Sequence, residues 1–155
     1  MEVHVEYGDI VKATTEVIVN AWNRNIIPWF LLIPMGVSGA IKRHGGYRPF
    51  NELLRCGPIP LGEALLTSAG RLPFKGIIHV AGINMLWRSS EYAIRRSVAS
   101  AMAIVNAEGF RSVTFPVIGV GSGGFDEERA LACMLDEFEH LDSTAEARIV
   151  RYKRG

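Results

Sequence analysis

The segment SVTFPVIGVGSGGF, from Ser112 to Phe125, decides the fold class because it joins a β-branched run to a loop that holds four glycines. Ser112 to Ile118 has the composition of a strand, and Asp126 to His140 then has the pattern of a helix. A glycine loop between a strand and a helix is typical of layered α/β proteins. The glycines allow several backbone amides to turn toward one point, which suits a phosphate or diphosphate.

The glycine loop fits neither of two common nucleotide-binding motifs. Gly119 to Gly124 matches GxGxxG by letter, but the dinucleotide fingerprint needs a further βαβ unit with an acid roughly 20 residues on, and too little chain follows. The loop also lacks the Lys-Ser/Thr pair of a Walker A motif. The acids from Asp126 to Glu128 complement the helix dipole themselves, so the loop amides are the better anion donors. A plain glycine-rich turn remains the alternative interpretation.

Outward from this segment, the chain alternates between predicted strands and predicted helices. This alternation predicts a layered α/β domain with a largely parallel sheet, and the length of 155 residues fits a single domain over residues 1–155. The predicted strands are Val3 to Tyr7, Glu16 to Ala21, Glu63 to Ser68, Gly76 to Ala81, Ser112 to Ile118 and Arg148 to Tyr152. The predicted helices are Ser38 to His44, Pro49 to Cys56, Ser89 to Glu108 and Asp126 to His140.

The charge balance argues against two classes of protein. With a formal net charge of +1 and high apolar content, the chain is neither disordered nor a nucleic-acid binder that works by bulk charge. Its one basic cluster, Arg151, Lys153 and Arg154, is interpreted as a solvated end. The first ten residues alternate like a strand, unlike a signal peptide.

The two cysteines, Cys56 and Cys133, lie far apart among apolar residues and form no CxxC. We therefore expect two buried thiols in a reducing compartment, the cytoplasm. The sequence has no zinc-site spacing and no HExxH, so no metal site is expected.

The segment Ile26–Met35, IIPWFLLIPM, is unusually apolar for the position between a polar NRN and a glycine-spaced GVSGAI. It falls short of the about 20 residues that span a bilayer, and Pro28 and Pro34 interrupt it, so no membrane contact is expected. Three interpretations stay open. The segment could be buried in the domain, form a lid to which Trp29 or Phe30 contributes, or be a partner surface, including one for self-association.

Polar residues follow two predicted strands, at positions where an α/β sheet places its ligands. Asp9 follows the first strand and Asn23 the second. A carboxylate can accept from an exocyclic adenine amine, and an Asn side chain can both donate to and accept from ribose hydroxyls. Each alone could equally be a turn or cap residue. His79, inside GIIHVA, is interpreted as a hydrogen-bonded core histidine rather than a catalyst.

Five motifs follow one another along the chain: GDI (8–10), EVIVNAWN (16–23), GVSGAI (36–41), GEALLTSAGRLPFKGIIHVAG (62–82) and SVTFPVIGVGSGGF (112–125). In this order they resemble the macro domain, the ADP-ribose-binding module. The resemblance covers most of the chain, and the ordered set is far more specific than any one motif. It implies a three-layer α/β/α sandwich around a mixed, largely parallel sheet. It also implies ADP-ribose or an ADP-ribosylated protein as the partner, with no cofactor.

The resemblance also implies roles for individual residues. Asp9 would accept from the adenine amine with the Ile10 amide beside it, and Asn23 would contact the distal ribose. The other implied ligand contacts are the two glycine loops and the aromatic residue after the second, namely Gly36, Val37, Gly119, Val120, Gly121, Ser122, Gly123, Gly124 and Phe125. Ile26–Met35 stands where the family usually has a glycine run, so it would form a wall on the distal-ribose side of the pocket.

The choice between an enzyme and a binder stays open. Hydrolytic members of the de-mono-ADP-ribosylating type carry an Asp that helps to activate water where this chain has Ser38, and a hydroxyl is a poor base near neutral pH. Trp22 and Gly123 are further departures from the family pattern. Asn23 and Ser38 are the candidate catalytic residues. The prediction is a protein that binds ADP-ribose and removes or processes ADP-ribosyl groups, as a mono-ADP-ribosyl hydrolase or O-acyl-ADP-ribose deacylase. The alternative is a non-catalytic reader of ADP-ribose.

Overall fold

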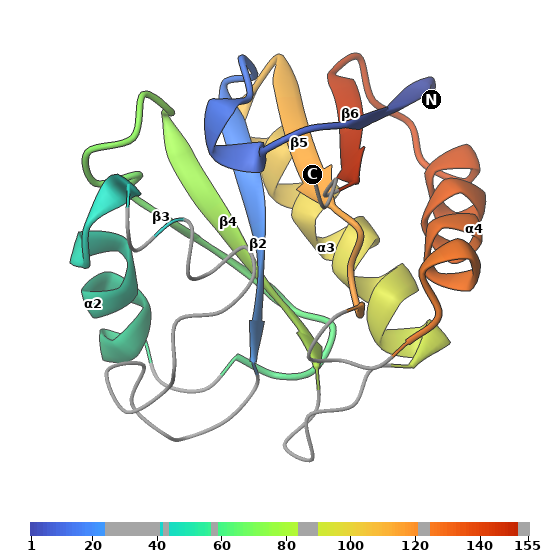
Figure 1. Ribbon diagram of the computed structural model, residues 1–155, viewed down its shortest axis with the longest axis horizontal. Coiled ribbons are helices and arrows are strands. Elements are labelled where there is room, and N and C mark those ends of the chain that lie inside the picture. Colours follow the sequence, from blue (N-terminus) through green and yellow to red (C-terminus); the bar gives the residue numbers. More distant parts are fainter. Residues whose placement is uncertain (24–40, 42–43, 57–58, 84–89, 121–124, 152–155) are drawn as a thin grey trace.

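The computed structural model describes residues 1–23, 41, 44–56, 59–83, 90–120 and 125–151 (Figure 1). The strands are β1 (Val3–Tyr7), β2 (Val17–Asn23), β3 (Ala64–Thr67), β4 (Gly76–Ile83), β5 (Ser112–Pro116) and β6 (Glu146–Arg151). The helices are the short 3-10 turn η1 (Ile10–Lys12), α2 (Arg48–Arg55), α3 (Glu91–Glu108) and α4 (Glu127–Glu139). All six predicted strands and the last three predicted helices are confirmed, with their ends moved by a few residues. Of the predicted helix Ser38 to His44, only Ile41 and His44 are described, and both are helical.

The described strands form one mixed sheet in the order β1-β6-β5-β2-β4-β3. Every neighbouring pair is parallel except β3 and β4, which are antiparallel, so the predicted sheet is confirmed. The carboxyl ends of the five parallel strands therefore lie along one edge of the sheet, which we call the carboxyl edge. The arrowheads of β2 and β4 mark it at the lower side of Figure 1. The register of β2 on β4 shifts there, from Trp22 opposite Ala81 to Asn23 opposite Ile83.

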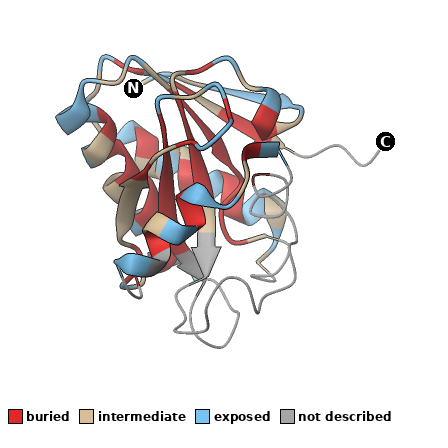
Figure 2. Ribbon diagram, turned by 90° about the vertical axis from the view of Figure 1, so that its left-hand side faces the viewer, coloured by how far each residue is buried: buried red, intermediate tan, exposed pale blue. Residues whose placement is uncertain are grey.

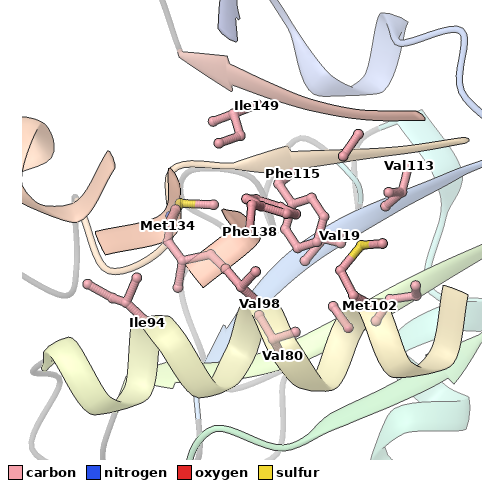
Figure 3. Packing of buried hydrophobic residues seen from close by; sticks show 14 of the residues in the cluster. Val19, Val80, Ile94, Val98, Met102, Val113, Phe115, Met134, Phe138 and Ile149 are labelled. Carbon is pink, nitrogen blue, oxygen red and sulfur yellow. The ribbon is translucent and has the colours of Figure 1, made fainter. Parts of the chain in front are cut away.

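Helices α3 and α4 cover one face of the sheet and enclose the larger of two apolar cores. Helix α3 begins after Ser90, whose hydroxyl accepts from the Ala93 N–H, and ends at the left-handed Gly109. Figure 3 shows Ile94 and Val98 of α3 directed toward Phe115 of β5 and Phe138 of α4. The two phenylalanine rings meet edge to face, with centroids 5.1 Å apart. The spacing of apolar residues along α3 thus places the apolar face of this helix against the sheet.

The opposite face of the sheet carries the smaller core, under α2 and η1. Phe50 and Leu53 of α2 and Ile10 of η1 pack there with Ile18 and Ile77 from the central strands. In Figure 2 the strands are the mostly buried layer, and exposure concentrates on helix surfaces and turns. Helices on both faces of a sheet make the three-layer α/β/α sandwich that the resemblance implied. Among the described residues, no helix has the length and apolarity needed to cross a membrane.

One of the two predicted buried cysteines is not buried. Cys133 on α4 is buried, but Cys56 is exposed. Helix α2 ends at Arg55, and the Cys56 N–H donates to the Leu53 carbonyl at 3.1 Å to close its last turn. Cys56 therefore lies beyond the helix, where the helical spacing that buries Leu53 no longer directs a side chain toward the core.

Candidate functional site

Asp9 stands at the carboxyl end of β1 and is held there by two sets of contacts. The Gly8 N–H donates to the Arg151 carbonyl at 3.0 Å, which fixes the end of β1 against β6. One Asp9 carboxylate oxygen then accepts from the Val11 N–H at 3.1 Å and caps η1. The buried side chains of Ile10 and Val11 anchor this turn. A carboxylate has lone pairs for several donors, so an Asp that caps a turn can still accept from a ligand.

The backbone of η1 leaves one amide in a suitable place beside Asp9. The N–H groups of Val11, Lys12 and Ala13 donate within the turn. For the Ile10 N–H no hydrogen bond is recorded within the part of the chain that the structure describes. A carboxylate acceptor next to a backbone donor is the pair that an amino-substituted heteroaromatic ring can engage along one edge.

The glycine loop after β5 is closed at its base. Gly119 is buried and adopts a φ of 91°, which favours glycine, and its carbonyl accepts from the Phe125 N–H at 3.0 Å. Phe125 packs on the larger core, and the Arg129 guanidinium lies 5.1 Å above its ring. Val120 is half-buried beside this closure. The loop therefore begins and ends at fixed positions on the carboxyl edge, next to the first turn of α4.

The acidic residues after the loop are engaged in the fold. Asp126 caps α4 by accepting from the Arg129 N–H at 2.9 Å. Glu127 and Glu128 both pair with Arg151 at the end of β6, and these bonds raise the pKa of the Arg151 guanidinium. The interpretation of Arg151 as part of a solvated tail is therefore wrong, since its side chain is only 15% exposed. The ion pairs of Arg151 could not be predicted from the sequence, because its partners precede it by more than 20 residues.

Another acid, Glu91 at the start of α3, accepts from the Cys133 thiol at 3.2 Å and lies 3.8 Å from Arg129. Burial, with this carboxylate beside the sulfur, raises the pKa of Cys133, so the group is a thiol and not a ready nucleophile. Glu91 thus ties α3 to α4, and its partner Arg129 also contacts Phe125 at the end of the loop.

A buried polar row crosses the sheet behind the carboxyl edge. The Asn20 amide of β2 lies 3.0 Å from His79 Nδ1 on β4, and the Thr67 hydroxyl of β3 lies 2.8 Å from His79 Nε2. Because that hydroxyl donates to the Ser68 carbonyl, it accepts from Nε2–H, and Nδ1 accepts from Asn20. The prediction of a hydrogen-bonded core histidine is confirmed. Asn20 and Thr67 were missed as partners, although a polar residue inside an apolar strand is a usable signal.

The structure describes only a few atoms of the remaining predicted site residues. The backbone of Asn23 ends β2 at the carboxyl edge, one strand away from β5, but its side chain lies outside the described part. Gly36, Val37 and Ser38, the segment Ile26–Met35, and the loop residues Gly121, Ser122, Gly123 and Gly124 also lie outside the described residues. Their roles stay predictions. The fold does bring Asp9, Gly119 and the end of β2 to one edge from three distant parts of the chain.

The family model for the Macro domain matches residues 19–134 of this chain. The chain belongs to the macro domain family. This macro domain is 35% identical over 136 residues to the O-acetyl-ADP-ribose deacetylase of Citrobacter koseri, covering 83% of this chain and 73% of that relative. It is 33% identical over 151 residues to an uncharacterised protein of Aquifex aeolicus, covering 97% of this chain and 88% of the relative.

Solved structures agree with this assignment. A variant of the Oceanobacillus iheyensis macrodomain with ADPR is 28% identical and superposes with a TM-score of 0.80, covering 97% of this chain and 84% of that one. The family and the sandwich that the ordered motifs implied are thus confirmed for this macro domain.

Proposed function

We propose that this macro domain binds ADP-ribose along the carboxyl edge of its sheet and hydrolyses the ester bond of O-acyl-ADP-ribose, acting as a single domain in the cytoplasm. The observation that carries the proposal is the convergence of Asp9 and the closed loop from Gly119 to Phe125 on that edge. A relative named O-acetyl-ADP-ribose deacetylase, aligned over 83% of the chain, supports the choice of ester.

The two described parts of the site suit the two halves of an adenosine diphosphate. Asp9 and the Ile10 amide suit the amine and ring nitrogen of adenine. The glycine loop suits the diphosphate, because backbone amides without side chains can approach its oxygens closely. We assign Gly36, Val37 and the loop residues 119–124 to the phosphates, with Phe125 packing near the ligand. Asn23 is assigned to the distal ribose, where it both donates and accepts.

Ester hydrolysis needs a water that attacks the acyl carbon while the ribose oxygen leaves with a proton. The described acids beside the loop, Asp126 and Glu127, are engaged in a helix cap and an ion pair. We therefore assign no carboxylate base among them. Asn23 would orient the ribose, and Ser38 would hold the water rather than deprotonate it, which predicts a modest rate.

Binding is tested first, by calorimetric titration of ADP-ribose into wild type and Asp9→Ala. We expect Asp9→Ala to weaken binding by roughly 1.5–3 kcal/mol, the range for losing a hydrogen bond to a charged group. Asp142→Ala, which removes an exposed carboxylate from the turn before β6 at the other edge, should bind as wild type does. Equal affinity in Asp9→Ala and wild type would contradict the adenine assignment.

Catalysis is tested separately, by following acetate release from O-acetyl-ADP-ribose. We expect turnover by wild type, a lower kcat in Asn23→Ala and a higher rate in Ser38→Asp, which restores the carboxylate of hydrolytic members. A release assay on mono-ADP-ribosylated protein distinguishes the hydrolase type. Normal ADP-ribose binding with no turnover of either substrate would contradict the proposed catalytic activity. It would favour the alternative, a non-catalytic reader of ADP-ribose.

A further inference from the structure

Strand β1 forms one end of the strand order, so one of its sides has no neighbouring strand among the described residues. The strand reads VHVEY, and four of its five residues are exposed. Val5 and Tyr7 are 41% and 61% exposed, and they are two of the four large apolar side chains that stand out at the described surface. Strand β1 carries neither Pro nor Lys, two residues that commonly protect an edge strand from pairing.

The backbone of β1 shows which groups face outward. The Gly8 N–H donates to the Arg151 carbonyl of β6, so even-numbered residues of β1 direct their N–H and C=O groups to β6. In a strand these groups alternate sides from one residue to the next. The N–H and C=O groups of Val3, Val5 and Tyr7 therefore point away from the sheet. Between described residues, no hydrogen bond to these groups is recorded.

This alternation restricts how a second β1 strand can pair in antiparallel fashion. Only outward-facing residues can exchange hydrogen bonds, so an odd-numbered residue must lie opposite an odd-numbered one. Centring the pair on Val5 satisfies this condition and uses the whole strand. Val5 then faces Val5 of the second copy, and Val3 faces its Tyr7. The two adjacent allowed registers are centred on His4 and on Glu6.

The side chains favour the register centred on Val5. On one face of the joined sheet, His4 lies opposite Glu6 of the second copy twice, in non-hydrogen-bonded pairs whose side chains approach most closely. The other two registers would put His4 against His4 or Glu6 against Glu6, which is unfavourable. Arg148 of β6 lies 3.7 Å from Glu6 and adds positive charge beside the same acid.

The opposite face of the pair is apolar. Val3, Val5 and Tyr7 share the side of β1 that faces the larger core, where Val3 packs. Pairing about Val5 places each Tyr7 ring beside Val3 of the other copy, and aromatic with β-branched pairs stabilise cross-strand contacts. The Arg151 guanidinium, 5.2 Å above the Tyr7 ring, holds that ring at the edge in advance.

We propose that two copies of this chain pair through their β1 strands, antiparallel about Val5, into one continuous sheet. The proposal does not depend on the ligand. Five residues a side is far below the 20–30 residues a side of a standard interface, so the dimer forms at high concentration and dissociates on dilution.

The first test is sedimentation of the full chain from micromolar to millimolar concentration. Wild type should rise from 17.1 kDa toward twice that mass. Val5→Pro should remain a monomer and stay folded, because the N–H it loses faces outward and donates nothing to β6. Val5→Thr, which keeps both the N–H and the β-branch, is the matched control and should dimerise. A monomeric wild type, or a dimer that persists in Val5→Pro, would overturn the proposal. A dimer that persists in Val5→Pro would indicate that the copies meet through another surface, such as Ile26–Met35.

The second test addresses the register. His4→Glu places two acids opposite one another, and Glu6→Lys places a lysine opposite His4, so each variant alone should associate less than wild type. Mixed together, the two variants place a glutamate opposite a lysine at one contact and restore His4 opposite Glu6 at the other, so they should form a heterodimer. A mixture no heavier than its components would overturn the pairing about Val5.

Discussion

His79 illustrates how a single residue depends on its neighbours in this fold. The ring is fully buried between Asn20 and Thr67 and meets the Phe50 ring edge to face, with centroids 5.7 Å apart. None of these three neighbours is titratable, so none of them favours the charged form of the ring. Burial lowers the pKa of His79 to about 3, which keeps the imidazole neutral, and the hydrogen bonds to Thr67 and Asn20 place its proton on Nε2.

This pKa predicts an acid sensitivity with a definite sign. The folded state takes up the proton near pH 3, but the unfolded chain takes it up near pH 6.5, so the unfolded state binds more protons between these values and stability falls as the pH falls. From pH 7 to pH 5 the free energy of unfolding should drop by about 2 kcal/mol. Urea denaturation at the two pH values measures this drop.

His79→Gln is the control for that prediction, since its amide can bond to both neighbours and does not titrate. The variant should be less stable at pH 7 but should lose less on acidification. Hydrogen bonds lower the pKa of Glu16 and, against the opposing effect of burial, that of Glu52, so these two carboxylates affect stability mainly at lower pH. An equal drop in both proteins would show that another group is responsible.

At the scale of elements, two glycines with similar backbone angles end different kinds of segment. Gly119 follows β5 with a φ of 91° and closes the loop onto Phe125. Gly109 ends α3 with a φ of 72° and has open space where a Cβ would stand. Gly109 precedes β5 and so lies at the other edge of the sheet. Substituting these two glycines in turn therefore distinguishes the stability cost of backbone strain from the loss of ligand binding by the loop.

We expect Gly119→Ala and Gly109→Ala each to lower stability by about 1 kcal/mol, because each forces a side chain into the left-handed region. Only Gly119→Ala should also weaken ADP-ribose binding, since it alone disturbs the loop assigned to the diphosphate. Thermal unfolding and calorimetric titration of both variants measure the two effects. If Gly119→Ala bound ADP-ribose normally, the loop would be a turn and the diphosphate would lie elsewhere.

At the scale of the whole molecule, the sheet separates two cores and joins them into one unit. Ile149 of β6 packs in the larger core and Ile18 of β2 in the smaller, on opposite faces and with β5 between their strands. Both side chains are fully buried. The two side chains belong to separate apolar clusters, but the strands that carry them belong to one hydrogen-bonded sheet.

Ile18→Val and Ile149→Val should each cost about 0.5–1.5 kcal/mol of stability. The double variant should lose the sum to within about 0.5 kcal/mol, because the two side chains lie in separate clusters on opposite faces of the sheet. Its denaturant unfolding should remain one transition by fluorescence and by far-ultraviolet circular dichroism. Two separate transitions would mean that the two faces unfold independently.

The sequence by itself determined the fold class, the positions of the strands and helices, and the family. These properties depend on short-range patterns: the spacing of Ile94 and Val98 on one helix, the β-branched run before Gly119, and the order of the motifs. The buried, hydrogen-bonded state of His79 also followed from its apolar strand. Apart from the order of the motifs, which spans most of the chain, such features are set by residues within one or two turns of each other.

Only the tertiary structure decided which distant segments meet. It placed Asp9 on the same edge of the sheet as the loop that begins at Gly119, paired Arg151 with Glu127, turned Cys56 to the surface and made β1 an end strand among the described strands. The physical reason is that strand order and ion pairing depend on how the chain closes over long separations. The local pattern of VHVEY is the same for a central strand and an edge strand, and only its neighbours in space distinguish the two.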